Sequence, residues 1–135
     1  MFLHLLDNDE HKAAFLELAN LVTKVDGYVN KKEKMYLKAF RAEMNLPEPE
    51  HEQYADRSVA DIIGGIDNEL VRHIMFTEIL IMTFSDGDYN DSEKQIVTEI
   101  REHLGISADK YDAFLNWVKR HGELQIQGMQ LIMGI

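Results

Sequence analysis

The sequence predicts an all-α fold, a single-domain helical bundle built from two diverged helical-hairpin repeats around a buried central helix. Three observations lead to this prediction. Only 2 prolines and 8 glycines interrupt the 135 residues. Apolar side chains recur with helical spacing along most of the chain. A stretch of sequence also repeats at an offset of 60 residues. With 45% hydrophobic residues, the chain has enough apolar material for a core of domain size.

The first predicted hairpin joins two amphipathic helices. Residues 9–25 carry apolar side chains on one face, and Asn8 or Asp9 is a suitable N-cap. The second helix spans about 31–45, and Pro47 stops it because proline cannot continue a helix. These two helices form the first repeat.

The connection between the hairpins is polar at its start and apolar at its end. Residues 48–57 are charged and polar, and we expect either a short exposed helix or a linker there. A short helix then follows the capping residue Ser58 and ends at Gly64 and Gly65.

The second predicted hairpin begins with the central helix, at about 68–85. Apolar side chains cover nearly its whole circumference, and a helix of this kind is buried on most sides. A further helix spans about 91–104, and Gly105 ends it.

The last part of the chain is predicted to form two helices. Ser107 caps the first of them, which runs to about Arg120. We expect His121 and Gly122 to break it, because glycine weakens a helix interior. Residues 123–135 then form a last helix packed on the core.

The repeat relates residues 18–46 to residues 78–106. Seven positions of the first copy meet identical residues in the second: Thr23, Asp26, Gly27, Asn30, Glu33, Lys34 and Arg41. The apolar positions coincide as well, which indicates two copies of one hairpin around a common core. Residues 1–135 thus form one domain, with repeat 1 at 9–46, a connecting segment at 47–66, repeat 2 at 67–120 and a C-terminal segment at 121–135.

Each of the two repeated turns has a purely structural interpretation. The glycine ends one helix, the asparagine caps the next, and the glutamate completes a capping box. These residues are Gly27, Asn30 and Glu33 in the first turn and Gly87, Asn90 and Glu93 in the second.

The capping interpretation leaves Asp26 and Asp86 unexplained. Each follows the C-terminal end of a predicted helix, where the helix dipole disfavours a carboxylate by a few tenths to about 1 kcal/mol. A cation would offset this cost, and oxygen ligands suit Ca²⁺ or Mg²⁺. In the second turn Asp86, Asp88 and Asn90 alternate as in the first half of an EF-hand loop. The candidate metal ligands are Asp26, Glu33, Asp86, Asp88, Asn90 and Glu93.

The second turn is the better candidate for cation binding. It is not an EF-hand, because Asp91 stands where that loop needs glycine and Val97 where it needs a bidentate glutamate. In the first turn the positions matching Asp88 and Asp91 hold Tyr28 and Lys31, and the lysine opposes a cation. We therefore expect tighter binding at residues 86–93.

The doubled Asp-Gly…Glu motif resembles the tellurite-resistance TerB-like family. It is also similar to the helical N-terminal domain of membrane-anchored DnaJ-type co-chaperones. The resemblance covers about residues 18–117 and implies an all-α bundle without established catalysis. It also implies a stress-linked scaffold or sensor whose acidic residues bind divalent cations. Residue by residue, that role falls on Asp26, Glu33, Asp86 and Glu93.

This chain departs from a symmetric two-site pattern, because Lys31 and Lys32 place two positive charges in its first turn. It also contains no His-Pro-Asp motif, so a co-chaperone activity is not expected.

Composition narrows the functional classes further. The net charge of −10 disfavours a nucleic-acid partner, and no apolar stretch is long enough to insert into a membrane. The absence of cysteine and of a basic, apolar leader favours a cytoplasmic protein. The six histidines form no i, i+4 pair, and neither a phosphate loop nor a Gly-x-Ser-x-Gly motif is present, so we expect no enzyme. The leading hypothesis is a TerB-like cation-binding domain. The alternatives are a protein-interaction module, monomeric or homodimeric, and a metal-dependent hydrolase.

Overall fold

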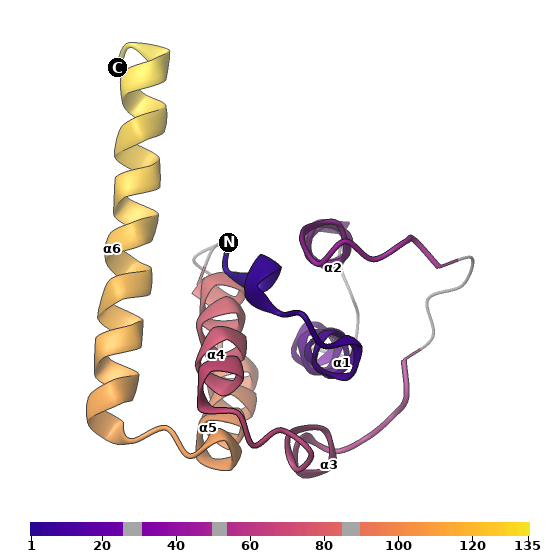
Figure 1. Cartoon of the computed structure of the whole chain (residues 1–135). Coiled ribbons are helices and arrows are strands. Elements are labelled where there is room, and N and C mark those ends of the chain that lie inside the picture. Colours follow the sequence, from indigo (N-terminus) through magenta and orange to yellow (C-terminus); the bar gives the residue numbers. More distant parts are fainter. Residues whose placement is uncertain (26–30, 50–53, 85–89) are drawn as a thin grey trace.

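The computed structural model describes residues 1–25, 31–49, 54–84 and 90–135, and it is all-helical over these ranges (Figure 1). The predicted all-α class is confirmed. None of the described helices combines the length and the apolar content that a membrane span needs. The elements are a 3-10 turn η1 (Leu3–Leu5) and the helices α1 (Asp9–Lys24), α2 (Lys31–Glu43), α3 (Val59–Ile63), α4 (Glu69–Phe84), α5 (Asp91–Leu104) and α6 (Ala108–Met133).

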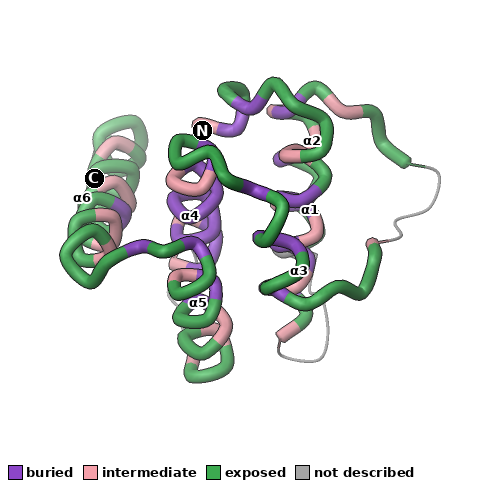
Figure 2. The backbone as a smooth tube through the Cα atoms, turned by 60° about the horizontal axis from the view of Figure 1, so that its bottom comes forward, coloured by how far each residue is buried: buried purple, intermediate pink, exposed green. Residues whose placement is uncertain are grey.

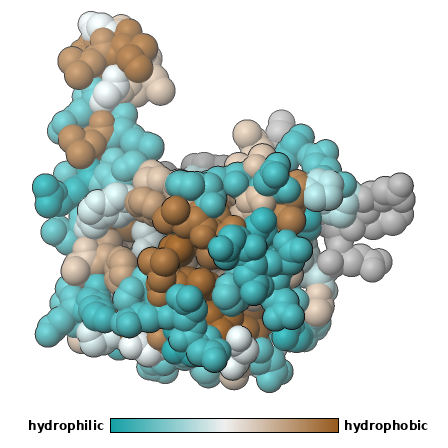
Figure 3. All heavy atoms as spheres, viewed as in Figure 1, coloured by the Kyte–Doolittle hydropathy of each residue, from teal (hydrophilic) through white to brown (hydrophobic). Residues whose placement is uncertain are grey.

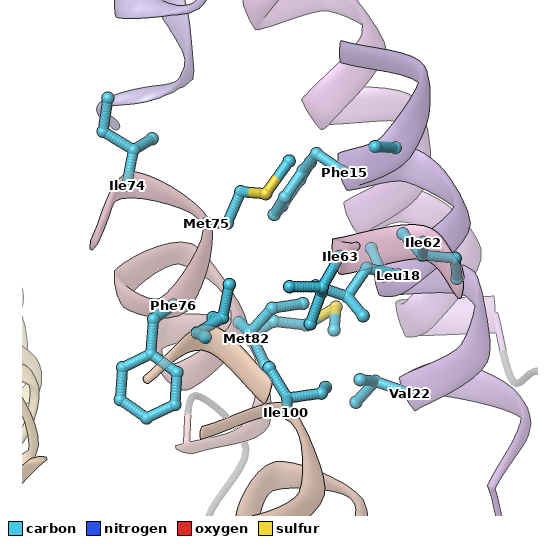
Figure 4. Packing of buried hydrophobic residues seen from close by; sticks show 14 of the residues in the cluster. Phe15, Leu18, Val22, Ile62, Ile63, Ile74, Met75, Phe76, Met82 and Ile100 are labelled. Carbon is cyan, nitrogen blue, oxygen red and sulfur yellow. The ribbon is translucent and has the colours of Figure 1, made fainter. Parts of the chain in front are cut away.

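Helix α4 contacts α1, α5, α6 and η1. Most of its residues from Val71 to Thr83 are buried because its sequence is apolar on almost every side. Figure 4 shows Phe15 of α1 pointing toward Met75 of α4, and Val22 of α1 toward Ile100 of α5. Figure 2 shows burial concentrated along α4 and on the sides of its neighbours that face it.

The helices of the two predicted hairpins occupy matching positions in the sequence. Helix α1 begins at Asp9 and α4 at Glu69, and α2 begins at Lys31 and α5 at Asp91, so both pairs of starts are 60 residues apart. Helices α1 and α4 are also equally long, at 16 residues each.

The same offset relates the N-caps of α1 and α4. The side-chain oxygen of Asn8 accepts from the His11 N–H at 3.2 Å, and that of Asn68 accepts from the Val71 N–H at 3.2 Å. The predicted cap at Asn8 is confirmed. Both asparagines satisfy an N–H group that has no partner inside its own helix.

The connecting segment contains the short helix α3, and its described residues before α3 are not helical. Residues 46–49 and 54–58 are not helical, and residues 50–53 lie outside the described ranges. The predicted capping of α3 is confirmed, because Ser58 Oγ accepts from the Asp61 N–H at 3.2 Å.

The predicted break at His121 and Gly122 is wrong. Helix α6 runs through Gly122 without interruption to Met133. A glycine costs a helix only about 1 kcal/mol, which its helix-forming neighbours offset. The Trp117 and His121 rings also stack in the turn that leads into the predicted break, with centroids 5.3 Å apart.

The prediction that residues 123–135 pack on the core is also wrong. Leu131 and Ile132 are each 82% exposed, and Ile135 is 81% exposed. In Figure 1 the C-terminal half of α6 projects beyond the rest of the molecule. A continuous helix cannot turn back toward the core, so the apolar side chains at its end remain in solvent.

Candidate functional site

Most of the predicted cation ligands lie outside the part of the chain that the structure describes. Asp26, Asp86 and Asp88 fall in the ranges 26–30 and 85–89, which are outside it. Glu33 belongs to the first turn of α2, and its side chain is likewise outside the described part. The cation site therefore stays a prediction, and the structure shows the surroundings of Asn90 and Glu93 only.

Asn90 and Glu93 form a helix cap. The Asn90 Oδ1 atom accepts from the Glu93 N–H at 2.9 Å, and the Asn90 Nδ2 atom donates to Glu93 Oε1 at 3.3 Å. The predicted N-cap at Asn90 is confirmed. The Glu93 carboxylate also lies in the first turn of α5, where the helix dipole stabilises negative charge. Both residues thus have a structural role that needs no ligand.

A second acidic cluster, which sequence reasoning missed, holds the N-terminus of the chain. Glu78 of α4 is only 2% exposed, and its Oε1 atom accepts from the Phe2 N–H at 2.7 Å. The same oxygen lies 3.3 Å from the Met1 amine, which is also hydrogen-bonded to Glu43 of α2. The available signal was that Glu78 is the one charged residue between Ile74 and Phe84, the most apolar stretch of α4.

The electrostatics of this cluster favour its charged forms. Partial burial opposes ionisation of Glu43, but the hydrogen bond and positive charge of the Met1 amine outweigh burial and lower the pKa of the carboxyl group. Partial burial likewise opposes the charged amine, but hydrogen bonding to Glu43 and the charge of Glu78 raise the pKa of the Met1 amine. The cluster ties η1 to α2 and α4 and is a structural clasp.

The first half of α6 is anchored on α4 by aromatic side chains. The Phe76 ring of α4 lies 5.8 Å from the Phe114 ring and 6.0 Å from the Tyr111 ring, between ring centroids. One helical turn beyond Phe114, Val118 is buried. These contacts fix the direction in which the rest of α6 leaves the molecule.

The second half of α6 presents a broad apolar surface, which we call the α6 apolar face. Six large apolar side chains of this half, and that of Ile135 just beyond its end, are each more than half exposed and make up this face. They are Leu124, Ile126, Met129, Leu131, Ile132, Met133 and Ile135. Figure 3 shows this apolar end standing apart from the rest of the molecule.

Part of the α6 apolar face continues the side of the helix that packs on α4. Met129 and Ile132 follow Val118 by 11 and 14 residues, spacings that return to nearly the same side of an α-helix. No residue from Leu124 to Gly134 carries a charged side chain. The face therefore has the composition of a buried helix but lies in solvent.

Comparison with known proteins finds no relative of this chain. The chain matches no protein-family model, and no curated protein and no solved structure is significantly similar to it. The resemblance to the TerB-like family rests on the residues of the two repeated turns.

Proposed function

We propose that this chain is a non-enzymatic interaction module that presents the α6 apolar face to another protein. The observation that carries the proposal is the exposure of six large apolar side chains on the uncharged helical segment from Leu124 to Met133. Burying one such side chain in a partner yields about 1.5–3 kcal/mol. Contiguous apolar surface of this kind marks interaction sites in proteins that dissolve in water.

A retention experiment tests this role. The tagged chain is immobilised and mixed with untagged chain or with cell extract, and bound proteins are eluted and identified. We expect a bound protein with the wild type and none with the double variant Leu131→Gln, Ile132→Gln. The matched control is Gln127→Ser, Gln130→Ser, which changes the polar side of the same segment and should behave as the wild type. Equal retention by all three chains would refute the proposal.

The second candidate function is binding of a divalent cation at residues 86–93, as the TerB-like resemblance implies, in a stress-associated protein. The supporting observation is that α4 ends at Phe84 and α1 at Lys24, so Asp86 and Asp26 each follow a helix end by two residues. The helix dipole disfavours an unpaired carboxylate at such a position. The acid-rich second turn remains the better candidate, with Asp86 and Asp88 as its principal ligands.

Thermal melts test the cation role. Unfolding is followed with Ca²⁺, Mg²⁺, Mn²⁺ or Zn²⁺ at millimolar concentration, for the wild type and for Asp86→Ala, Glu93→Ala. A cation that binds only the folded chain raises Tm, and the double variant should lose this increase. Asp112→Ala, an exposed acidic position on α6, serves as the control. If no ion raises Tm of the wild type, this candidate is wrong.

A further inference from the structure

We propose that the N-terminal clasp, which the Met1 amine forms with Glu43 and Glu78, makes the fold sensitive to the chemical state of that amine. A free ammonium closes the clasp, and an amide at the Met1 nitrogen opens it. The clasp joins η1 to α2 and α4 and contains no residue of the α6 apolar face, so this sensitivity is independent of the interaction role of α6.

Two carboxylates from different helices converge on the N-terminus. Glu78 Oε1 accepts from the Phe2 N–H at 2.7 Å and lies 3.3 Å from the Met1 nitrogen. The Met1 amine also donates to Glu43 Oε1, and Glu43 Oε2 accepts from the His4 N–H at 3.2 Å. The amine is therefore bound by both carboxylates, and each carboxylate also binds a backbone N–H group close to it.

Glu78 depends on the Met1 amine for its positive partner. Its side chain is only 2% exposed, so little water reaches the carboxylate. Among the residues that the structure describes, the Met1 amine is the only cationic group that forms an ion pair with it. Glu43 has the same amine and also the His4 ring, whose Nδ1 atom lies 3.6 Å from Oε2. A buried carboxylate that loses its positive partner destabilises the folded state.

Acylation of the amine removes both the charge and the donors that the clasp uses. When an acyl thioester reacts at the Met1 nitrogen, a C–N bond forms, the C–S bond breaks and a thiol leaves. Of the three ammonium protons, one stays on the nitrogen, one leaves with the thiol and one passes to solvent. The product is a neutral amide whose single N–H cannot serve Glu43 and Glu78 together. The two carboxylates then lie close together as like charges, which is unfavourable.

Opening of the clasp affects more than the first residue. Leu3 of η1 is fully buried and Leu6 is 4% exposed, so the clasp fixes a segment that contributes to the core. The Phe2 ring also lies against the Trp117 ring of α6, with centroids 5.8 Å apart. Loss of the contacts to Glu78 therefore loosens the attachment of η1 to α4 and changes the surroundings of Trp117.

Acetylation of the α-amine tests the proposal. Two forms of the full chain are compared, one with a free Met1 amine and one with an acetyl group on that nitrogen, as verified by intact mass. We expect acetylation to lower Tm by roughly 3–8 °C. Trp117, the single tryptophan, should show red-shifted emission and stronger quenching by acrylamide. Equal Tm and equal emission for the two forms would overturn the proposal.

Carboxylate variants show whether the acetyl group acts through the clasp. In Glu43→Gln and in Glu78→Gln the amine has lost one of its two carboxylates, so acetylation should lower Tm much less than in the wild type. Glu48→Gln is the matched control, because Glu48 pairs with Lys38 at the surface, and it should respond to acetylation as the wild type does. An equal loss of Tm in all four chains would mean that the acetyl group acts elsewhere, which would overturn the proposal.

The reactivity of the amine gives a second measurement that needs no acetylated chain. Burial opposes the charged amine, but hydrogen bonding to Glu43 and the charge of Glu78 raise the pKa of the Met1 amine above its ordinary value of 8.0. Only the uncharged amine attacks an activated ester. At neutral pH, Met1 should therefore be labelled roughly fivefold more slowly in the wild type and in Glu48→Gln than in Glu43→Gln. Equal labelling rates in the three chains would show that the carboxylates do not hold the ammonium, and the proposal would fail.

Discussion

Asn45 and Gly105, 60 residues apart in the sequence, adopt the same left-handed conformation at the ends of α2 and α5, with φ angles of 60° and 70°. After each of them the chain closes the helix with the same bond. The Leu46 N–H donates to the Arg41 carbonyl at 2.8 Å, and the Ile106 N–H donates to the Arg101 carbonyl at 3.1 Å. Helices α2 and α5 thus share the conformation that ends them.

The left-handed conformation shared by Asn45 and Gly105 predicts opposite effects of two substitutions on the free energy of unfolding. Gly105→Ala should lower the free energy of unfolding by about 1 kcal/mol, because the left-handed region disfavours a Cβ. The atom nearest to that Cβ is Arg72 Nη1 at 3.9 Å, an ordinary contact, so the cost comes from the backbone. Asn45→Gly should raise the same free energy by a few tenths of a kcal/mol. Urea unfolding measures both, and a Gly105→Ala effect no larger than that of Gly65→Ala would contradict the prediction.

Glu78→Ala should destabilise the fold strongly. The substitution removes the acceptor of the Phe2 N–H from a site that is 2% exposed, at a cost of about 1–3 kcal/mol in the free energy of unfolding. Glu78→Gln keeps a side-chain oxygen there and should lose less. Glu102→Ala, at an exposed position of α5, is the reference. Chemical denaturation measures the free energy of unfolding of each protein, and equal values for Glu78→Ala and Glu102→Ala would contradict the prediction.

The clasp between Met1 and Glu43 predicts a pH dependence with two limbs. The pKa of Glu43 is below its ordinary value of 4.5, so its contribution to stability is present above pH 4.5 and is lost as pH falls through the lowered pKa. The pKa of the amine is above its ordinary value of 8.0, so its contribution is present below pH 8.0 and is lost as pH rises through the raised pKa.

Melting curves between about pH 3 and pH 10 should therefore show that the Tm of the Glu43→Gln protein falls less steeply than that of the wild type, both toward low pH and toward high pH. Glu48→Gln is the control, since Glu48 pairs with Lys38 at the surface and both side chains are at least 65% exposed. An unchanged pH profile in Glu43→Gln would argue against the clasp.

Gly122→Ala should stabilise α6. A Cβ at this position meets no atom within 4 Å, and alanine is about 1 kcal/mol more favourable than glycine inside a helix. Circular dichroism should show equal or greater helical content and a higher Tm. A loss of helix or a lower Tm would mean that residue 122 needs the freedom of a glycine and that α6 is interrupted there.

Local sequence signals predicted helix starts and ends because their chemistry is local. A side-chain oxygen at Asn8, Ser58, Asn90 or Ser107 accepts from an N–H group three residues later, whatever the rest of the fold does. The apolar circumference of α4 likewise predicted its burial. The end of α6 was not predictable in this way, because an apolar segment has the same sequence whether it covers its own core or extends from it.

The sequence by itself determined the helical class and most of the helix starts and ends, since these follow from periodicity and capping. Only the tertiary structure decided which groups meet across the chain. It placed Glu78 against Phe2, 76 residues away. It also set the direction of α6. The aromatic contacts of Phe76 with Tyr111 and Phe114 fix the first half of α6 on α4, and the 26-residue helix then extends beyond the core. The exposed apolar face of α6 is the consequence of that geometry.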